Sequence, residues 1–187
     1  FLGKMVEPVS STKNPYSKME MGVPYTHTPK FLQFDYRLVA PAGAPIYSSG
    51  FGSKKKLSGR DNAEVFVLLQ RRWEDAKGNI HAERVGTGRE RFGKTTMGWV
   101  NKHRIPIWYG DIRHHAGYKS FMGLIPREKS YYARNSKGKM KPVIEEKWAP
   151  VGTKPTHVVV MLSSGCGTAY TGTVGMTLWV DNVAFVH

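Results

Sequence analysis

Several features that would fix the class of a protein at once are missing from this sequence. It has one cysteine, Cys166, so no disulfide can form within the chain. No apolar run reaches the ~18 residues of a membrane-spanning helix, and no signal peptide is recognisable. The glycine-rich phosphate loop, the GxGxxG fingerprint and the nucleophile elbow are missing too. These absences exclude a disulfide-stapled scaffold and a transmembrane helix, and they leave no motif for nucleotide binding.

Acidic residues are scarce. Lys and Arg number 28 against 14 Asp and Glu, which gives a formal net charge of +14. The excess is concentrated in residues 113–142, where Glu128 is the one acid among eight basic residues. Such a charge favours anionic partners, either acidic polysaccharides or nucleic acid, but it does not indicate a fold.

No segment shows a sustained helical period, whereas apolar residues alternate with polar ones in several short runs. Glycine and proline are plentiful (20 and 11), as a turn-rich β protein requires. The clearest predicted strands are residues 31–38, 63–73, 80–86, 105–109, 157–162 and 176–185, with the second and third joined as a hairpin. A chain of 187 residues suffices for one such domain, so we predict a single all-β unit over residues 1–187.

The last thirty residues suggest how the sheets are arranged. Residues 157–162 form an apolar, β-branched run typical of a strand buried on both faces. Residues 176–185 alternate, with Met176, Leu178 and Val180 on one face and Trp179 and Phe185 on the other. We interpret the two runs as the closing strand pair of a β-sandwich made of two antiparallel sheets, with little helix.

A family resemblance supports this interpretation. Ser163, Ser164, Gly167, Tyr170, Gly172 and Gly175, followed by residues 177–183 (TLWVDNV), resemble the end of the carbohydrate metabolism domain found in secreted and surface lipoproteins of gut Bacteroidetes. Residues 21–36 and the stretch from Trp99 to Tyr109 resemble earlier parts of it. The resemblance implies a jelly-roll sandwich that associates with glycans. It also implies a secreted, outer-surface or periplasmic protein of a Gram-negative bacterium.

The start of the chain agrees with such a setting. The sequence begins at Phe1 without a methionine, so we expect the C-terminal module of a longer secreted protein whose leader, upstream part or lipid anchor has been removed.

Residues 110–150 are predicted to form a long basic, aromatic insertion, and loops of this length are usually functional or have structure of their own. Sugar binding needs aromatic rings that stack on pyranose faces and planar polar groups that bond hydroxyls. The candidate ligand-binding residues are therefore the aromatic and arginine side chains in and beside this insertion: Trp108, Arg113, Tyr118, Tyr131, Tyr132, Arg134 and Trp148.

The sequence also offers candidates for a metal site and for a catalytic site. The resemblance to jelly-roll modules makes Asp181 a candidate ligand of a structural calcium ion, although no acidic partners accompany it in the sequence and no cofactor is required. Hydrolysis of a glycosidic bond needs two convergent carboxylates. Glu145 and Glu146 are adjacent, so on a strand they diverge, and we expect both to be solvated.

The sequence leaves three functions open. The first is a non-catalytic polysaccharide-binding module, with an anionic glycan favoured by the net charge. The second is an enzyme, either a glycoside hydrolase or a polysaccharide lyase. The third is a basic nucleic-acid-binding or capsid-like β protein, for which Lys54, Lys55 and Lys56 with residues 113–142 would track phosphates.

Overall fold

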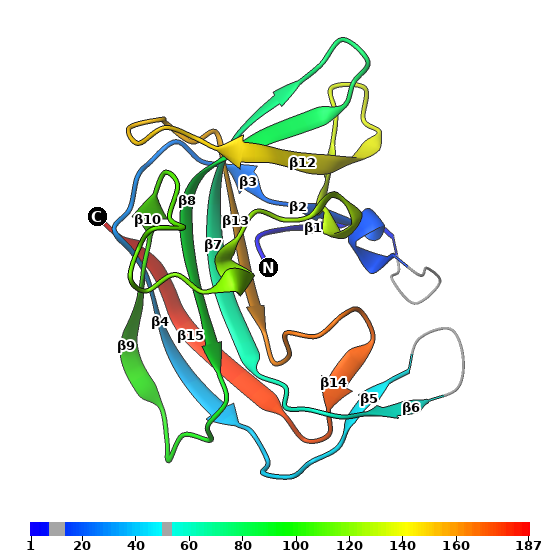
Figure 1. Ribbon diagram of the computed structural model, residues 1–187, viewed down its shortest axis with the longest axis vertical. Coiled ribbons are helices and arrows are strands. Elements are labelled where there is room, and N and C mark those ends of the chain that lie inside the picture. The colour runs from blue at the N-terminus through cyan, green and yellow to red at the C-terminus, as the bar shows by residue number, and fades with distance from the viewer. Residues whose placement is uncertain (8–13, 50–53) are drawn as a thin grey trace.

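The computed structural model describes residues 1–7, 14–49 and 54–187, and over these residues the chain is an all-β sandwich (Figure 1). Its strands are β1 (Gly3–Met5), β2 (Met19–Met21), β3 (Val23–Pro24), β4 (Phe31–Val39), β5 (Ile46–Ser48), β6 (Lys55–Leu57), β7 (Ala63–Glu74), β8 (Ile80–Phe92), β9 (Val100–Pro106), β10 (Trp108–Tyr109), β11 (Tyr132–Arg134), β12 (Met140–Trp148), β13 (His157–Ser163), β14 (Thr171–Thr173) and β15 (Thr177–Val186). Three short 3-10 helices complete this part of the chain: η2 (Pro15–Lys18), η3 (Ser120–Met122) and η4 (Arg127–Lys129).

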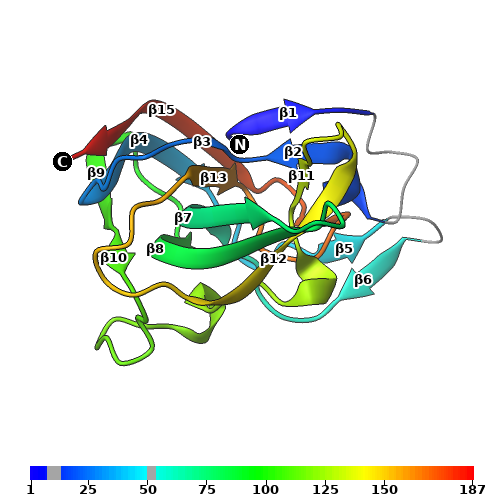
Figure 2. The same ribbon diagram turned by 90° about the horizontal axis from the view of Figure 1, so that it is seen from above.

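The sandwich has two principal sheets, seen as two layers in Figure 2. The main sheet runs β1-β2-β11-β12-β8-β7-β13-β3, with β10 paired to β8, and the opposing sheet runs β15-β4-β9. Strands β14, β5 and β6 form a small third sheet at one end (Figure 1). The predicted all-β sandwich with little helix is confirmed, and no helix in the described ranges is long and apolar enough to cross a bilayer.

The long hairpin β7–β8 is the centre of the main sheet, as the alternation and the turn signal predicted. Its turn is closed by Asp75, which accepts backbone hydrogen bonds from Lys77 and Asn79, and by Gly78 with φ of 78°. The core lies between the sheets. Leu32, Phe34, Tyr36 and Leu38 of β4 face Val65, Val67 and Leu69 of β7 and Val158 and Val160 of β13, all of them buried.

The predicted pairing of the last two long strands is wrong. Strand β13 pairs with β7 in the main sheet, whereas β15 pairs with β4 in the opposing sheet. Both strands carry an apolar face, and they can bury those faces across the core as well as side by side. The predicted alternation is also broken, because a bulge at Asp181, with Asn182 at φ of 50°, turns Phe185 toward the core.

The sheets were predicted to be antiparallel, and the main sheet departs from this at two strand pairs. Strand β12 runs parallel to β8, and β11 pairs with β2 through a parallel bridge. Both β11 and β12 come from residues 110–150, which were predicted as an insertion. This stretch therefore has structure of its own, and it both widens the main sheet and covers part of its outer face.

That outer face is apolar where it is covered. Phe66 and Leu68 of β7 and Val159 of β13 point away from the central core into a second cluster with Met21 and Tyr131. Residues 157–162 are thus a strand with apolar side chains on both faces, as their composition predicted. Met21 of β2, from the far end of the same sheet, packs on these side chains together with η2 and residues 120–131. The pocket described next opens beside this cover.

Candidate functional site

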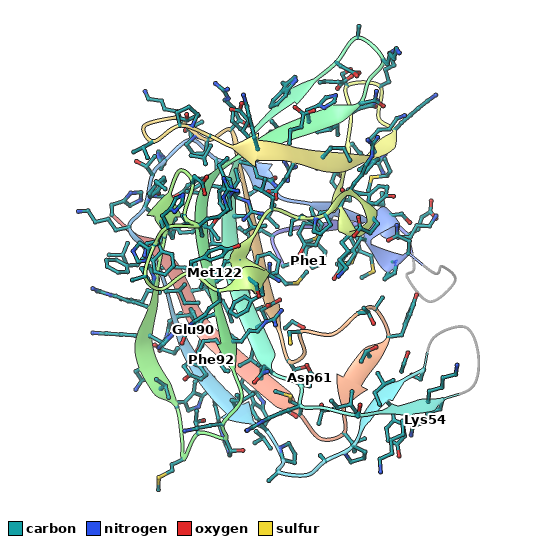
Figure 3. The ribbon with its side chains drawn as sticks, in the orientation of Figure 1. Phe1, Lys54, Asp61, Glu90, Phe92 and Met122 are labelled. Atoms are coloured by element: carbon teal, nitrogen blue, oxygen red, sulfur yellow. The ribbon has the colours of Figure 1, made fainter. Side chains whose placement is uncertain are left out.

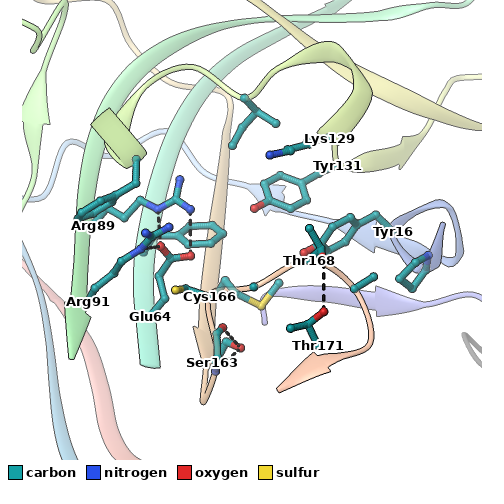
Figure 4. A pocket seen from close by; sticks show the side chains of 18 of the residues that line it. Tyr16, Glu64, Arg89, Arg91, Lys129, Tyr131, Ser163, Cys166, Thr168 and Thr171 are labelled. Atoms are coloured by element: carbon teal, nitrogen blue, oxygen red, sulfur yellow. Dashed lines mark hydrogen bonds and ion pairs between the residues drawn. The ribbon is translucent and has the colours of Figure 1, made fainter. Parts of the chain in front are cut away.

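A pocket of about 820 Å³ lies on the outer face of the main sheet. Its floor consists of side chains from β7, β8 and β13, namely Glu64, Phe66, Arg89, Arg91, Met161 and Ser163. One wall comes from Tyr16 of η2 and residues 120–131, and the other from the loop of residues 163–173 (Figure 4). We call this pocket the groove.

An arginine–glutamate cluster forms one side of the groove. The hairpin register places Glu64 opposite Arg91 and Phe66 opposite Arg89, so alternate residues of both strands present these side chains on one face. Glu64 Oε1 accepts hydrogen bonds from Arg91 Nε at 2.7 Å and from Arg89 Nε at 3.1 Å, and its Oε2 accepts one from Arg89 Nη2 at 2.9 Å. Both carboxylate oxygens are therefore occupied by guanidinium groups.

Aromatic rings hold these guanidiniums in place. The Arg89 guanidinium carbon lies 4.9 Å from the centroid of the Phe66 ring, and that of Arg91 lies 4.2 Å from the centroid of Phe121. Such cation–π contacts contribute roughly 0.5–1 kcal/mol each at exposed sites and more where water is excluded. The arginines are thus positioned before any ligand arrives.

Two tyrosines lie on the opposite side of the groove. Tyr131 stacks on Phe66 with ring centroids 5.9 Å apart and meets Tyr16 edge-to-face at 5.2 Å. Burial raises the pKa of both tyrosine hydroxyls above their ordinary value. Both side chains are therefore neutral phenols around neutral pH, suited to stacking and hydrogen bonding rather than to proton abstraction.

A buried ion pair fixes the wall above the tyrosines. Glu145 of β12 lies beside Arg84 of β8, which binds it through Nε at 2.6 Å and through Nη2, and Gln70 donates to the same carboxylate at 2.6 Å. The backbone N–H of Ile125, in the wall, donates to Glu145 Oε2 at 2.8 Å. Burial alone would raise the pKa of Glu145, but the charge of Arg84 and the hydrogen bonds from Arg84, Ile125 and Gln70 together hold that pKa below its ordinary value.

The prediction that Glu145 and Glu146 are both solvated is wrong for Glu145, which is buried. The prediction that they diverge is confirmed, because Glu146 lies on the exposed face and bonds His81 at 2.6 Å. Glu145 is thus a structural carboxylate that attaches the groove wall to the sheet.

The second wall, residues 163–173, is held by Asp61, which Figure 3 shows beside this loop. Asp61 Oδ1 accepts hydrogen bonds from the backbone N–H groups of Asn62 and Cys166, and its Oδ2 accepts one from the Thr173 hydroxyl at 3.4 Å. Cys166 lines the groove, and burial raises the pKa of its thiol. The loop is therefore fixed at both ends of its span.

Of the predicted ligand-binding residues, Tyr131 lines the groove and the other aromatic side chains do not. Tyr132 accepts a hydrogen bond from Asn14, Trp108 stacks on His115 at 3.8 Å, and Trp148 lies under the Arg84 guanidinium at 5.6 Å. Tyr118 is half-buried close to Gly123. The structure does not gather these side chains into one surface with Tyr131.

The predicted arginines also lie elsewhere. Arg113 is exposed and forms a bidentate ion pair with Asp111, two residues before it. Arg134 Nε lies 3.4 Å from Glu20 Oε2, and Arg134 Nη1 donates a hydrogen bond to the carbonyl oxygen of Gly138. Their roles in ligand binding stay predictions.

For calcium, the described residues contain no group of three or more His, Cys, Asp or Glu side chains arranged to hold a metal ion. The carboxylate of Asp181 accepts the backbone N–H of Asn182 at 2.7 Å, which stabilises the bulge in β15. The calcium assignment for Asp181 stays a prediction.

Sequence reasoning missed most of the groove, including Tyr16, Phe121, Arg89 and Arg91. A signal was present, because the basic run at residues 89–94 continues the alternation of the predicted hairpin. The strand was predicted to end at Gly86. The backbone continues to Phe92, and Gly88 allows the carbonyl oxygen of Pro106 to approach to 2.9 Å from where a Cβ atom would stand.

Comparison of the chain with protein-family models, with curated proteins and with solved structures finds no match.

Proposed function

We propose that the protein binds a glycan chain in the groove without cleaving it. The observation that carries this proposal is that aromatic rings and planar guanidiniums line the same pocket of about 820 Å³. Pyranose rings present apolar faces to aromatic side chains and hydroxyls to planar hydrogen-bonding groups. A pocket on the face of a sheet, open to solvent, suits a segment of a polymer.

Binding is favoured over cleavage by the state of the candidate catalytic groups. Glu64, the carboxylate on the groove floor, has both oxygens bonded to arginines. Glycoside hydrolysis needs two carboxylates that converge on the scissile bond, whereas the carboxylate of Glu64 is already bonded to Arg89 and Arg91. A lyase would need a base, and the raised pKa values of Tyr16 and Tyr131 oppose that role.

The resemblance to the carbohydrate metabolism domain supports the same function, and with it a secreted or surface location in a Gram-negative bacterium. A nucleic-acid-binding protein is the main competitor, because the chain is strongly basic. Nucleic acid would bind basic side chains anywhere on the surface, and its affinity would fall steeply as the salt concentration rises. Glycan binding in the groove depends on stacking as well and should persist at physiological salt.

The test is a glycan array that also carries single-stranded DNA, probed with the wild-type protein and with Phe121→Ala. We expect selective glycan binding that survives physiological salt and falls about tenfold or more in the variant, because a buried aromatic face contributes about 1.5–3 kcal/mol. Trp179→Ala, which removes an exposed aromatic side chain from the opposing sheet, is the matched control and should bind normally. Binding to every polyanion, abolished by salt, would refute the proposal.

A further inference from the structure

The charges around the groove are arranged on both of its sides. Arg89 and Arg91 lie on one side, and Figure 4 shows Lys129 across the opening beside Tyr131. The carboxylates that line the same space are Glu64 and Glu128. Of these, Glu64 lies among the arginines, whereas Glu128 belongs to the exposed part of η4. A ligand in the groove therefore lies between cationic groups.

Glu64 accepts hydrogen bonds from only some of the N–H groups of the two arginines. Arg91 donates to it through Nε, and Arg89 through Nε and Nη2. Among the described residues, the two terminal nitrogens of Arg91 and the Nη1 of Arg89 have no hydrogen-bond partner. None of these three nitrogens belongs to the buried polar atoms that lack a partner. Their N–H groups are thus available to an acceptor that enters from the groove.

The surroundings make these N–H groups strong donors. The side chains of Arg89 and Arg91 are only 12% and 30% exposed, and the ring of Phe121 lies over Arg91 at 4.2 Å. Partial exclusion of water strengthens an interaction between opposite charges. A guanidinium edge with two free N–H groups also matches the paired oxygens of a carboxylate or a sulfate better than a single hydroxyl.

We infer that the groove selects an acidic glycan, one whose sugars carry carboxylate or sulfate groups, and that Arg91 and Lys129 bind these acidic groups. This inference rests on the proposed function, since it names the class of glycan that the same groove binds. Phe121 and Tyr16, which are partly exposed, contact the sugar rings, and the buried Tyr131 supports Tyr16. Arg91 and Lys129 face the acidic groups. Selectivity for acidic over neutral sugars therefore comes from side chains distinct from those that bind the rings.

The experiment uses three matched hexasaccharides: oligogalacturonate, a sulfated oligogalactose and neutral oligogalactose. Their dissociation constants are measured by titration calorimetry at low and physiological salt. We expect the wild-type protein to bind one or both acidic probes at least about tenfold more tightly than the neutral one, as a charge-assisted two-pronged contact allows. The oligogalacturonate and sulfated arms separate carboxylate from sulfate recognition.

Variants assign the preference to the groove. Arg91→Ala and Lys129→Ala should each reduce the acidic-over-neutral ratio several-fold, because each weakens the binding of the acidic probes more than that of the neutral one. Arg91→Lys retains the charge and a long side chain without the planar fork, and it provides a milder variant if alanine disturbs the fold. Arg104→Ala is the control, because Arg104 is an exposed arginine of β9 in the opposing sheet and its loss removes the same charge.

The outcomes separate the two proposals. Equal affinity for neutral and acidic probes, unaffected by Arg91→Ala but weakened by Phe121→Ala, would overturn the inference and leave glycan binding in the groove intact. The same loss of preference in Arg104→Ala would also overturn it, since net charge alone would then be responsible. Binding of single-stranded DNA with no glycan binding at all would reject both.

Discussion

The two outer faces of this sandwich differ sharply. The outer face of the main sheet is covered by η2, β2 and residues 120–131, and the groove opens there. The outer face of the opposing sheet, β15-β4-β9, is bare: Trp179 is 42% exposed, and Arg37 lies over its ring at 5.3 Å. Trp99, just before β9, is 48% exposed. One face thus has enclosed, preorganised side chains and the other has isolated aromatic side chains in solvent.

The difference follows from the strands. Strand β7 carries apolar side chains on both faces around Phe66 and Leu68, so its outer face must be covered. Strand β4 places polar side chains such as Gln33, Asp35 and Arg37 on its outer face, so that face can remain in water. The layer that buries the apolar outer face also creates the walls of the groove. Burial of apolar surface and the formation of a binding site are therefore linked on the main sheet.

The largest effect on stability should come from loss of the ion pair beneath the covered face. Glu145→Gln removes the partner of the fully buried Arg84 and should lower the free energy of unfolding by about 3–5 kcal/mol, as urea denaturation would measure. The matched control is Glu146→Gln on the next residue. Its side chain is 43% exposed and pairs with His81, so the loss should stay below about 1 kcal/mol.

This contribution should depend on pH. Because the pKa of Glu145 is lower in the folded protein, its stabilising effect is fully present above the ordinary carboxyl pKa of about 4.3 and is lost as pH falls through the lower folded value. The stability difference between wild type and Glu145→Gln should therefore shrink in acid. A difference that stays constant from neutral pH into this acidic range would contradict the assignment.

A moderate effect is expected at the loop that forms the second wall. Asp61→Asn weakens the hydrogen bonds to the N–H of Cys166 and to Thr173, and it should cost about 1–3 kcal/mol. The half-buried Cys166 thiol should then react several-fold faster with an alkylating reagent, which mass spectrometry can follow. Asp35→Asn on the bare face should leave that rate unchanged, and equal acceleration in both variants would argue against local release of the loop.

The smallest effect is expected on the bare face. Trp179→Ala should change the free energy of unfolding by no more than about 1 kcal/mol, because the exposed ring loses mainly its contact with Arg37. Glycan affinity should be unchanged in calorimetry. If this variant loses glycan binding while Phe121→Ala retains it, the glycan binds the bare face and not the groove.

The sequence predicted those elements whose pattern is local. The alternation of β4 and the hairpin β7–β8 follow from side-chain periodicity and turn residues, and both are as predicted. The placement of β13 and β15 in different sheets does not follow from their patterns, because an apolar face can be buried by a neighbouring strand or across the core. The same is true of β12, whose mixed composition gave no strand signal.

The groove was largely beyond prediction for a related reason. Tyr131 was selected as an aromatic residue in a basic stretch, but its partners Tyr16 and Phe66 come from distant parts of the chain. Arg89 and Arg91 follow two glycines that seemed to end their strand, whereas Gly88 permits the close approach of Pro106. Long-range contacts of this kind have no signature in local composition.

The most direct test of the groove as the binding site uses Cys166, the only cysteine, which lines it. The rate at which an alkylating reagent modifies this thiol is measured while oligogalacturonate hexasaccharide is titrated. Binding in the groove predicts that the rate falls to a plateau with the same dissociation constant that calorimetry gives. An alkylation rate unchanged at saturating hexasaccharide would show that the glycan binds elsewhere and would contradict the central claim.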